Sequence, residues 1–162
     1  MPSARSIIAL AAAAGTALAL AAPAYADTTA SGVGVRLTSK APGTTSGALV
    51  NATLDQTKYA DISVDISFQG FTANRGFAYR PGGCPADVVR LNIPAEVFQC
   101  GWEQEGSNAR LRLAIRGTFP TSVIGIRLTR ATLTTPAKSG RYTVEMSSWA
   151  FPTTSSTVRI NA

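Results

Sequence analysis

The sequence predicts an all-β fold, an antiparallel two-sheet sandwich. Apolar residues recur at every second position along several segments, and the helical spacing of 3.6 is absent. Residues that favour turns, mainly glycine, proline, asparagine and serine, separate these segments at short intervals. Alternating strands are half-buried, as in antiparallel sheets, whereas parallel sheets have continuously apolar strands. A closed barrel would give the same pattern, and we favour the sandwich.

The clearest strand covers residues 59–69, where Ile62, Val64 and Ile66 alternate with polar residues. Residues 109–116 repeat this pattern, with Leu111 and Leu113 on the apolar side. Similar alternation predicts strands at 124–129 and 142–147. Shorter strands are expected at 33–37, 48–50, 77–79, 88–93 and 158–160. Helix is limited to one turn, which we expect at 94–98.

Residues 1–26 have the features of a cleavable secretory signal peptide. Arg5 precedes an apolar run over 7–22, and Ala24-Tyr25-Ala26 forms a small-x-small cleavage signature. The run is shorter than the ~20 residues that a membrane span needs, and no later segment is suitable. We therefore expect cleavage after Ala26, a flexible tail at 27–31 and one sandwich domain at 32–162. The mature protein is expected to be secreted and extracellular.

The chain has two cysteines, Cys84 and Cys100, and no histidine. In an exported protein two cysteines are most simply one disulfide. A structural zinc site would need four Cys or His ligands, and a redox pair would normally have the Cys-x-x-Cys spacing. We expect a disulfide that stabilises the fold, with no metal and no cofactor.

Residues 134–144 contain Pro136, Gly140 and Tyr142, and a final Val158-x-Ile160 strand follows. This region resembles the last hairpin of bacterial secreted and cell-surface immunoglobulin-like domains. The resemblance implies an immunoglobulin-like sandwich and an exported location, and it implies no catalytic residue. The two cysteines are too close in sequence for the inter-sheet bridge of antibody domains, so a local bond is expected.

Most catalytic sites are excluded by composition. Without histidine there is no Ser-His-Asp or Cys-His arrangement, and oxidised cysteines leave no thiolate nucleophile. Glu103 and Glu105 remain as a carboxylate pair beside Trp102, and a retaining glycosidase needs two carboxyls about 5 Å apart in a groove. Residues 101–106 are bounded by glycines and predict a surface turn with solvated acids. We expect a non-enzymatic protein.

Arginine dominates the charge of the chain, with twelve arginines, three lysines and a formal net charge of +6. Arg110, Arg112 and Arg116 share one face of a predicted strand, and a hairpin through Pro120 would place Arg127 beside them. Like charges opposite each other destabilise a sheet. The arginines are therefore offset, paired with acids such as Glu145, or available to an anionic ligand; a solvated face that only aids solubility is the simplest alternative. No aromatic residue is interleaved with them, so nucleic acid is not an expected partner.

Aromatic residues near turns or strand ends form a second candidate surface, of the kind that sugar-binding modules use: Tyr79, Trp102, Trp149 and Phe151. Trp149 and Phe151 follow the outward-facing positions of their strand unless a bulge at 147–148 changes the alternation. The sequence thus predicts a secreted, non-enzymatic binding module for an anionic cell-surface polymer or a protein partner. The alternative is a carbohydrate-binding or glycoside-hydrolysing domain that uses Trp102, Trp149, Glu103 and Glu105. The oligomeric state is not indicated.

Overall fold

A computed structural model describes residues 33–53, 61–92, 95–117, 123–149 and 151–162. Their secondary structure consists of β-strands in two antiparallel sheets. No helix long and apolar enough to cross a bilayer occurs among the described residues. The predicted all-β, two-sheet architecture is confirmed. The predicted signal peptide, the N-terminal tail and the boundary at residue 32 lie outside the described residues.

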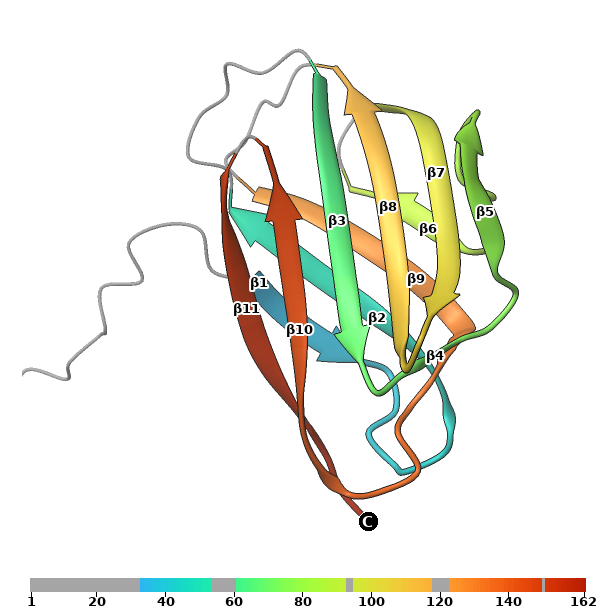
Figure 1. Ribbon diagram of the computed structural model, residues 1–162, viewed down its shortest axis with the longest axis vertical. Helices are drawn as coiled ribbons and strands as arrows, with labels where there is room; N and C mark the ends of the chain where they lie inside the picture. Colours follow the sequence, from blue (N-terminus) through green and yellow to red (C-terminus); the bar gives the residue numbers. More distant parts are fainter. Residues whose placement is uncertain (1–32, 54–60, 93–94, 118–122, 150) are drawn as a thin grey trace, which may run out of the picture.

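The smaller sheet contains β1 (Val33–Leu37), β2 (Thr45–Thr53), β9 (Val123–Thr134) and β4 (Thr72–Ala73) in that order, and β6 (Val89–Leu91) also pairs with β9. The larger sheet has six strands. Their order is β11 (Phe151–Ile160), β10 (Gly140–Ser148), β3 (Asp61–Gln69), β8 (Asn108–Arg116), β7 (Glu96–Glu105) and β5 (Phe77–Pro81). The six-stranded sheet lies in front in Figure 1, and the strands of the other sheet run obliquely behind it.

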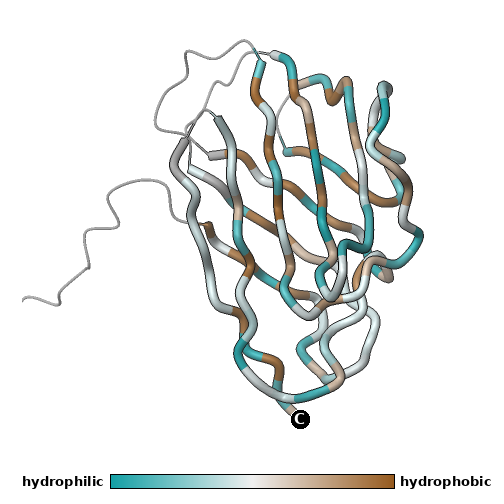
Figure 2. The backbone as a smooth tube through the Cα atoms, viewed as in Figure 1, coloured by the Kyte–Doolittle hydropathy of each residue, from teal (hydrophilic) through white to brown (hydrophobic). Residues whose placement is uncertain are grey.

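The core forms between the two sheets from the alternating apolar residues. Ile62, Val64 and Ile66 of β3 are fully buried, and the inward residues of β8 and β9 join them. Figure 2 shows the alternation of hydrophobic and hydrophilic residues along the front strands. Each such side chain contributes about 1.5–3 kcal/mol by leaving water. The predicted inward faces of the strands at 59–69, 109–116 and 124–129 are confirmed where the structure describes them.

The prediction of a surface turn at 101–106 is wrong, because Gly101 to Glu105 belong to the ten-residue strand β7. The predicted helical turn is wrong over Glu96–Phe98, which are also in β7; residues 93 and 94 lie outside the described part. A register shift between Val97 and Gln99 interrupts the alternation along β7 and hides the strand in the sequence. Beyond the shift, Cys100 and Trp102 face the core.

Gly101 marks a close approach of chain rather than a turn. A Cβ atom at this position would lie 2.6 Å from the Cα of Tyr79 on the neighbouring strand β5. β5 pairs with β7, and its register shifts between Phe77 and Arg80, so Tyr79 lies against Gly101 and a side chain there has no room. The Tyr79 ring lies at the outer face of the six-stranded sheet, where Arg112 contacts it.

Cys84 and Cys100 form the predicted disulfide, with their Cα atoms 5.3 Å apart. Cys100 is buried in β7, and Cys84 follows β5, which pairs with β7. The bond is local, as expected, and it fastens the segment after the edge strand β5 to β7, the strand next to that edge.

β9 contains a large bulge opposite Gly47. Ser46 pairs with Leu133 and Ala48 pairs with Leu128, so residues 129–132 of β9 face a single residue of β2. A Cβ atom on Gly47 would lie 2.6 Å from the carbonyl oxygen of Leu128, which explains the glycine. Within the bulge Ala131 has a φ of 67°, and this departure from strand geometry leaves Arg130 exposed.

Candidate anion-binding surface

The three predicted arginines of β8 project together from the outer face of the six-stranded sheet, and each is paired with a carboxylate. Arg110 donates to Asp65 of β3 through Nε at 2.8 Å and Nη2 at 2.6 Å, and it also pairs with Glu105 of β7. Arg116 donates to Asp61 of β3 at 3.0 Å. Arg112 pairs with Glu103 of β7. The acids on the two flanking strands thus neutralise the arginines between them.

These pairs also stabilise the charged forms of their members. The hydrogen bond from Arg110 holds the pKa of Glu105 below its ordinary value, and the hydrogen bonds to Asp65 and Glu105 raise the pKa of Arg110. Glu145, which the sequence suggested as a partner, lines a small depression beside Arg110 but makes no ion pair among the described residues. The arginines are paired with acids, but the acids are those of β3 and β7.

Aromatic rings contact two of the same guanidinium groups. The guanidinium carbon of Arg112 lies 5.2 Å from the centre of the Tyr79 ring, and that of Arg116 lies 4.7 Å from the centre of the Phe98 ring. Such cation–π contacts occupy the faces of guanidinium groups whose edges already meet carboxylates. The outer face of the six-stranded sheet therefore offers little free positive charge to an anionic ligand.

Arg127 does not join the arginines of β8, and the predicted hairpin is wrong. Both sides of β8 are already paired, with β3 and β7, so β9 has no place beside it. The chain crosses instead to the other sheet, where β9 pairs with β2, β4 and β6. Arg127 consequently lies on the opposite outer face of the sandwich.

On this opposite face Arg127 belongs to a row of side chains that crosses four strands. Arg36 of β1 pairs with Leu49 of β2, Leu49 pairs with Arg127 of β9, and Arg127 pairs with Arg90 of β6. Strands are about 4.8 Å apart in a sheet, so Arg36 and Arg90 begin about 14 Å apart. The bulge in β9 adds Arg130 next to this row. We call Arg36, Arg90, Arg127 and Arg130 the arginine row.

The arginine row lines an open depression of about 490 Å³, with Leu37 and Leu49 among its half-buried apolar residues. None of the described residues that line it is acidic. The Nε of Arg90 donates to the carbonyl of Ala86 at 2.8 Å, which orients this side chain. No other hydrogen bond and no ion pair holds the four guanidinium groups within the described part of the chain.

Sequence reasoning missed Arg36, Arg90 and Arg130. The alternation around Arg36, between Val35 and Leu37, was sufficient to place this residue on an outer face. The pairing of Arg36 and Arg90 with the Arg127 row depends on strand register across four strands, and the exposure of Arg130 depends on the bulge. Neither can be obtained from alternation within one strand.

The four predicted aromatic residues do not form one platform. Trp102 is fully buried, where its indole N–H donates to the carbonyl of Asn74 at 2.9 Å, so its predicted surface role is wrong. Tyr79 on the β5 edge is 37% exposed, and Trp149 between β10 and β11 is 65% exposed at the other edge of the same sheet. Phe151 begins β11 after a register shift at 146–148, and its side chain lies outside what the structure describes.

The carboxylates of Glu103 and Glu105 both point to arginines, and no described depression contains the two together. A general acid for glycoside hydrolysis needs a raised pKa, whereas the pKa of Glu105 is lowered. Among the residues that the structure describes, no group of acidic or cysteine side chains has a geometry suited to a metal ion.

Comparisons with known proteins identify no family for this chain. No protein-family model matches the sequence, and no curated protein matches it. A solved structure described as BslA, a bacterial hydrophobin, is similar, with a TM-score of 0.49 and 13% sequence identity. The match covers 81% of this chain and 98% of that chain.

Proposed function

We propose that this protein is an exported, non-enzymatic binding module that holds an anionic polymer across the arginine row of the five-stranded sheet. One observation carries the proposal: four exposed arginines line one depression, and no acidic residue shares its described lining. On the other sheet, by contrast, each of the three arginines of β8 has a carboxylate partner. Acidic side chains therefore neutralise the arginines of the six-stranded sheet, whereas the described lining around the arginine row of the five-stranded sheet has no acidic residue.

The chemistry of the row favours a polymer with closely spaced anionic groups. The planar guanidinium group presents two parallel N–H bonds to phosphate, sulfate or carboxylate, a geometry that lysine lacks. Arginines distributed over about 14 Å, as strand spacing gives, can each meet a separate charge of one extended chain. The half-buried Leu37 and Leu49 would contact the uncharged parts of the polymer between those charges.

An exported location is part of the proposal. The disulfide is consistent with an oxidising compartment outside the cytoplasm, and the N-terminal sequence has the features of a secretory signal. The two-sheet architecture is compatible with the suggested class of bacterial cell-surface immunoglobulin-like domains. We retain that class as a proposal, because it depends on the C-terminal hairpin motif.

Heparin, as a model polyanion, tests the arginine row by affinity chromatography in a salt gradient. The wild type should be retained and should elute as salt screens the charges. The variant Arg90→Gln with Arg127→Gln should bind at least about tenfold more weakly. A charge-assisted hydrogen bond contributes about 1.5–3 kcal/mol, and 1.4 kcal/mol corresponds to a factor of ten.

The matched control is Arg110→Gln with Arg112→Gln, which removes the same charge from the opposite sheet. This variant should be retained nearly as well as the wild type, because its arginines are already paired with acids. Equal loss in both variants would show that net charge alone governs retention and would overturn the proposal. Binding of a neutral polysaccharide with a change in Trp149 fluorescence would support the carbohydrate-binding alternative instead.

A further inference from the structure

A second group of basic residues lies at the end of the sandwich that contains the C-terminal end of β11. Lys40, Lys138, Arg141 and Arg159 are all exposed there. Backbone hydrogen bonds join the three segments that carry them: Gly43 N to Pro136 O at 3.0 Å, and Asn161 N to Lys40 O at 2.9 Å. We call these four residues the basic end.

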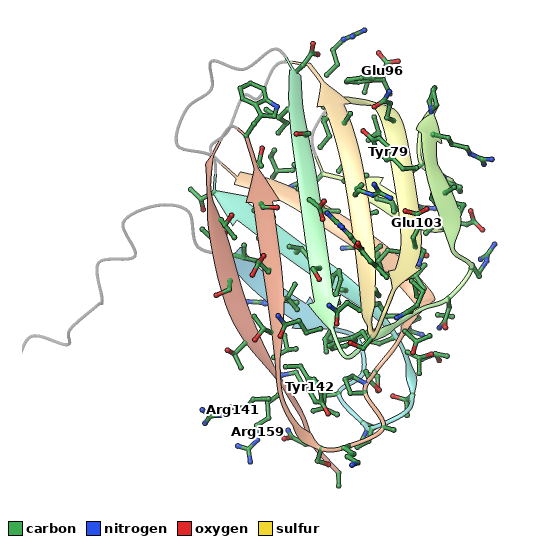
Figure 3. The ribbon with its side chains drawn as sticks, viewed as in Figure 1. Tyr79, Glu96, Glu103, Arg141, Tyr142 and Arg159 are labelled. Atoms are coloured by element: carbon green, nitrogen blue, oxygen red, sulfur yellow. A yellow bond between two sulfur atoms is a disulfide. The ribbon has the colours of Figure 1, made fainter. Side chains whose placement is uncertain are left out.

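Arg141 of β10 and Arg159 of β11 are directly opposite each other in the ladder. Both side chains point away from the molecule at the lower end of the two strands (Figure 3). Like charges at directly opposed positions destabilise a sheet, unless a counter-charge lies between them. The side chains of the neighbouring segments supply none, because residues 36–47, 133–144 and 156–162 contain no Asp or Glu, and no ion pair involves these arginines in the described part.

The backbone beneath the basic end is well anchored. The hydroxyl of Tyr142 donates to the carbonyl of Lys138 at 2.8 Å, and its ring packs edge-on against the buried Phe71. A Cβ atom on Gly70 would lie 3.0 Å from the same ring, so the turn after β3 also packs tightly against it. The turn that carries Lys138 is thus tied to the core, which reduces the ordering cost of binding a ligand at Arg141 and Arg159.

The position of the basic end differs from that of the arginine row. Val144 and Met146 of β10 face the core, so Arg141 at the alternate position faces outward from the six-stranded sheet. The arginine row faces outward from the other sheet. Arg141 and Arg159 line an open depression of about 740 Å³, and no residue of the arginine row is part of its described lining.

We propose that the basic end is a second anion-binding site, so that one molecule holds two segments of anionic polymer on opposite faces and cross-links them. The ligand chemistry is a phosphate, sulfate or carboxylate group held between Arg141 and Arg159, with Lys138 adding positive charge. Cross-linking rests on the proposed function, because the arginine row supplies the first binding site.

Stoichiometry with a short ligand tests the two sites separately. Isothermal titration with a heparin-derived tetrasaccharide should give two ligands per wild-type molecule. Arg141→Gln with Arg159→Gln should give one, and so should Arg90→Gln with Arg127→Gln. A single ligand on the wild type that is unaffected by the Arg141 and Arg159 changes would overturn the second site. A wild-type result for the Arg90 and Arg127 variant would overturn the proposed function, and with it the cross-linking, but not the second site.

A sequential binding experiment tests the cross-linking itself. Protein captured on immobilised heparin should retain a second, fluorescently labelled heparin added afterwards. The Arg141→Gln, Arg159→Gln variant should still be captured and should lose this retention, while Arg141→Lys with Arg159→Lys should restore much of it. Retention equal to that of the wild type by the glutamine variant would contradict the proposal. Arg110→Gln with Arg112→Gln is the matched control and should behave as the wild type in both steps.

Discussion

Glu105 and Arg110 illustrate, at the scale of single residues, how the six-stranded sheet neutralises its arginines. Arg110 sits between Asp65 and Glu105 on the two flanking strands and contacts both. Its hydrogen bond lowers the pKa of Glu105, and this effect has a direct spectroscopic consequence. The arginine extends the pH range over which Glu105 is a carboxylate to lower pH.

We expect the Glu105 carboxyl to titrate below its ordinary pKa in a ¹³C NMR pH titration. Because the folded-state pKa is lowered, the ion pair stabilises the fold above the unfolded pKa of Glu105. This contribution is lost as the pH falls through the lowered folded-state value. The substitution Arg110→Gln should raise the pKa of Glu105 towards its ordinary value. An unchanged pKa in that variant would show that another group causes the shift.

The sequence was sufficient to place the arginines of β8 but not their partners. Alternation correctly puts Arg110, Arg112 and Arg116 on one face. The acids that neutralise them were also visible as alternating pairs, Asp61 with Asp65 and Glu103 with Glu105. Connecting the two sets requires the knowledge that β8 lies between β3 and β7, which is a property of strand order. The alternative of a free anionic-ligand face therefore remained open at the level of sequence.

Among the elements, β9 has the greatest influence on the proposed binding surface. Its bulge opposite Gly47 inserts extra residues between Leu128 and Leu133, both of which stay in the core. Asn74 donates hydrogen bonds to two backbone carbonyls of the bulge. Its backbone N–H donates to the carbonyl of Thr132 at 2.8 Å, and its side-chain amide donates to the carbonyl of Ala131 at 3.2 Å. The bulge is thus a stable part of the fold.

The substitution Gly47→Ala should destabilise the fold by about 1–3 kcal/mol, the usual cost of overpacking. The new Cβ would lie 2.6 Å from the Leu128 carbonyl oxygen and 2.9 Å from that of Thr129, and backbone atoms cannot move aside as a side chain can. Urea denaturation measures the difference. The matched control is Gly34→Ala on β1, where the nearest atom is 3.9 Å away and little change is expected. Equal effects would argue against the bulge geometry.

Strand β7 shows where sequence reasoning fails at the scale of elements. Its glycine and its acidic residues are typical of a turn, and the register shift at 97–99 interrupts the alternation that would have indicated a strand. The glycine at position 101 is explained by the close contact of Tyr79 on β5, whose Cα would lie 2.6 Å from a Cβ atom there. Tertiary contact, rather than local preference, therefore determines this segment.

For the molecule as a whole, composition and alternation predict the two antiparallel sheets, and the disulfide follows from the two cysteines. The distribution of strands between the sheets is beyond such patterns, because consecutive strands such as β8 and β9 have equally alternating sequences. The error over Arg127 has this origin. The strand order must be known before charged residues can be assigned to the outer faces of the two sheets.

Removing the disulfide should weaken the whole sandwich. In the chain-entropy model a bridge with this sequence separation of 16 stabilises a fold by about 3 kcal/mol through the unfolded state. The variant Cys84→Ser with Cys100→Ala should therefore unfold at lower urea concentration than the oxidised wild type. Wild-type protein reduced before the measurement is the control and should resemble the variant. Equal midpoints for oxidised and reduced wild type would show that the bridge adds no stability.

The bulge in β9 also has a consequence for protein engineering. Arg130 and Ala131 reach solvent while Leu128 and Leu133 on either side keep their places in the interior. Thr129 donates a hydrogen bond to the carbonyl of Asp87 and Ala131 has a positive φ, so within the bulge it is position 130 that can be varied largely independently of folding. A library confined to it would be the most economical way to redirect the molecule towards other polymers, because the scaffold would be carried through unchanged.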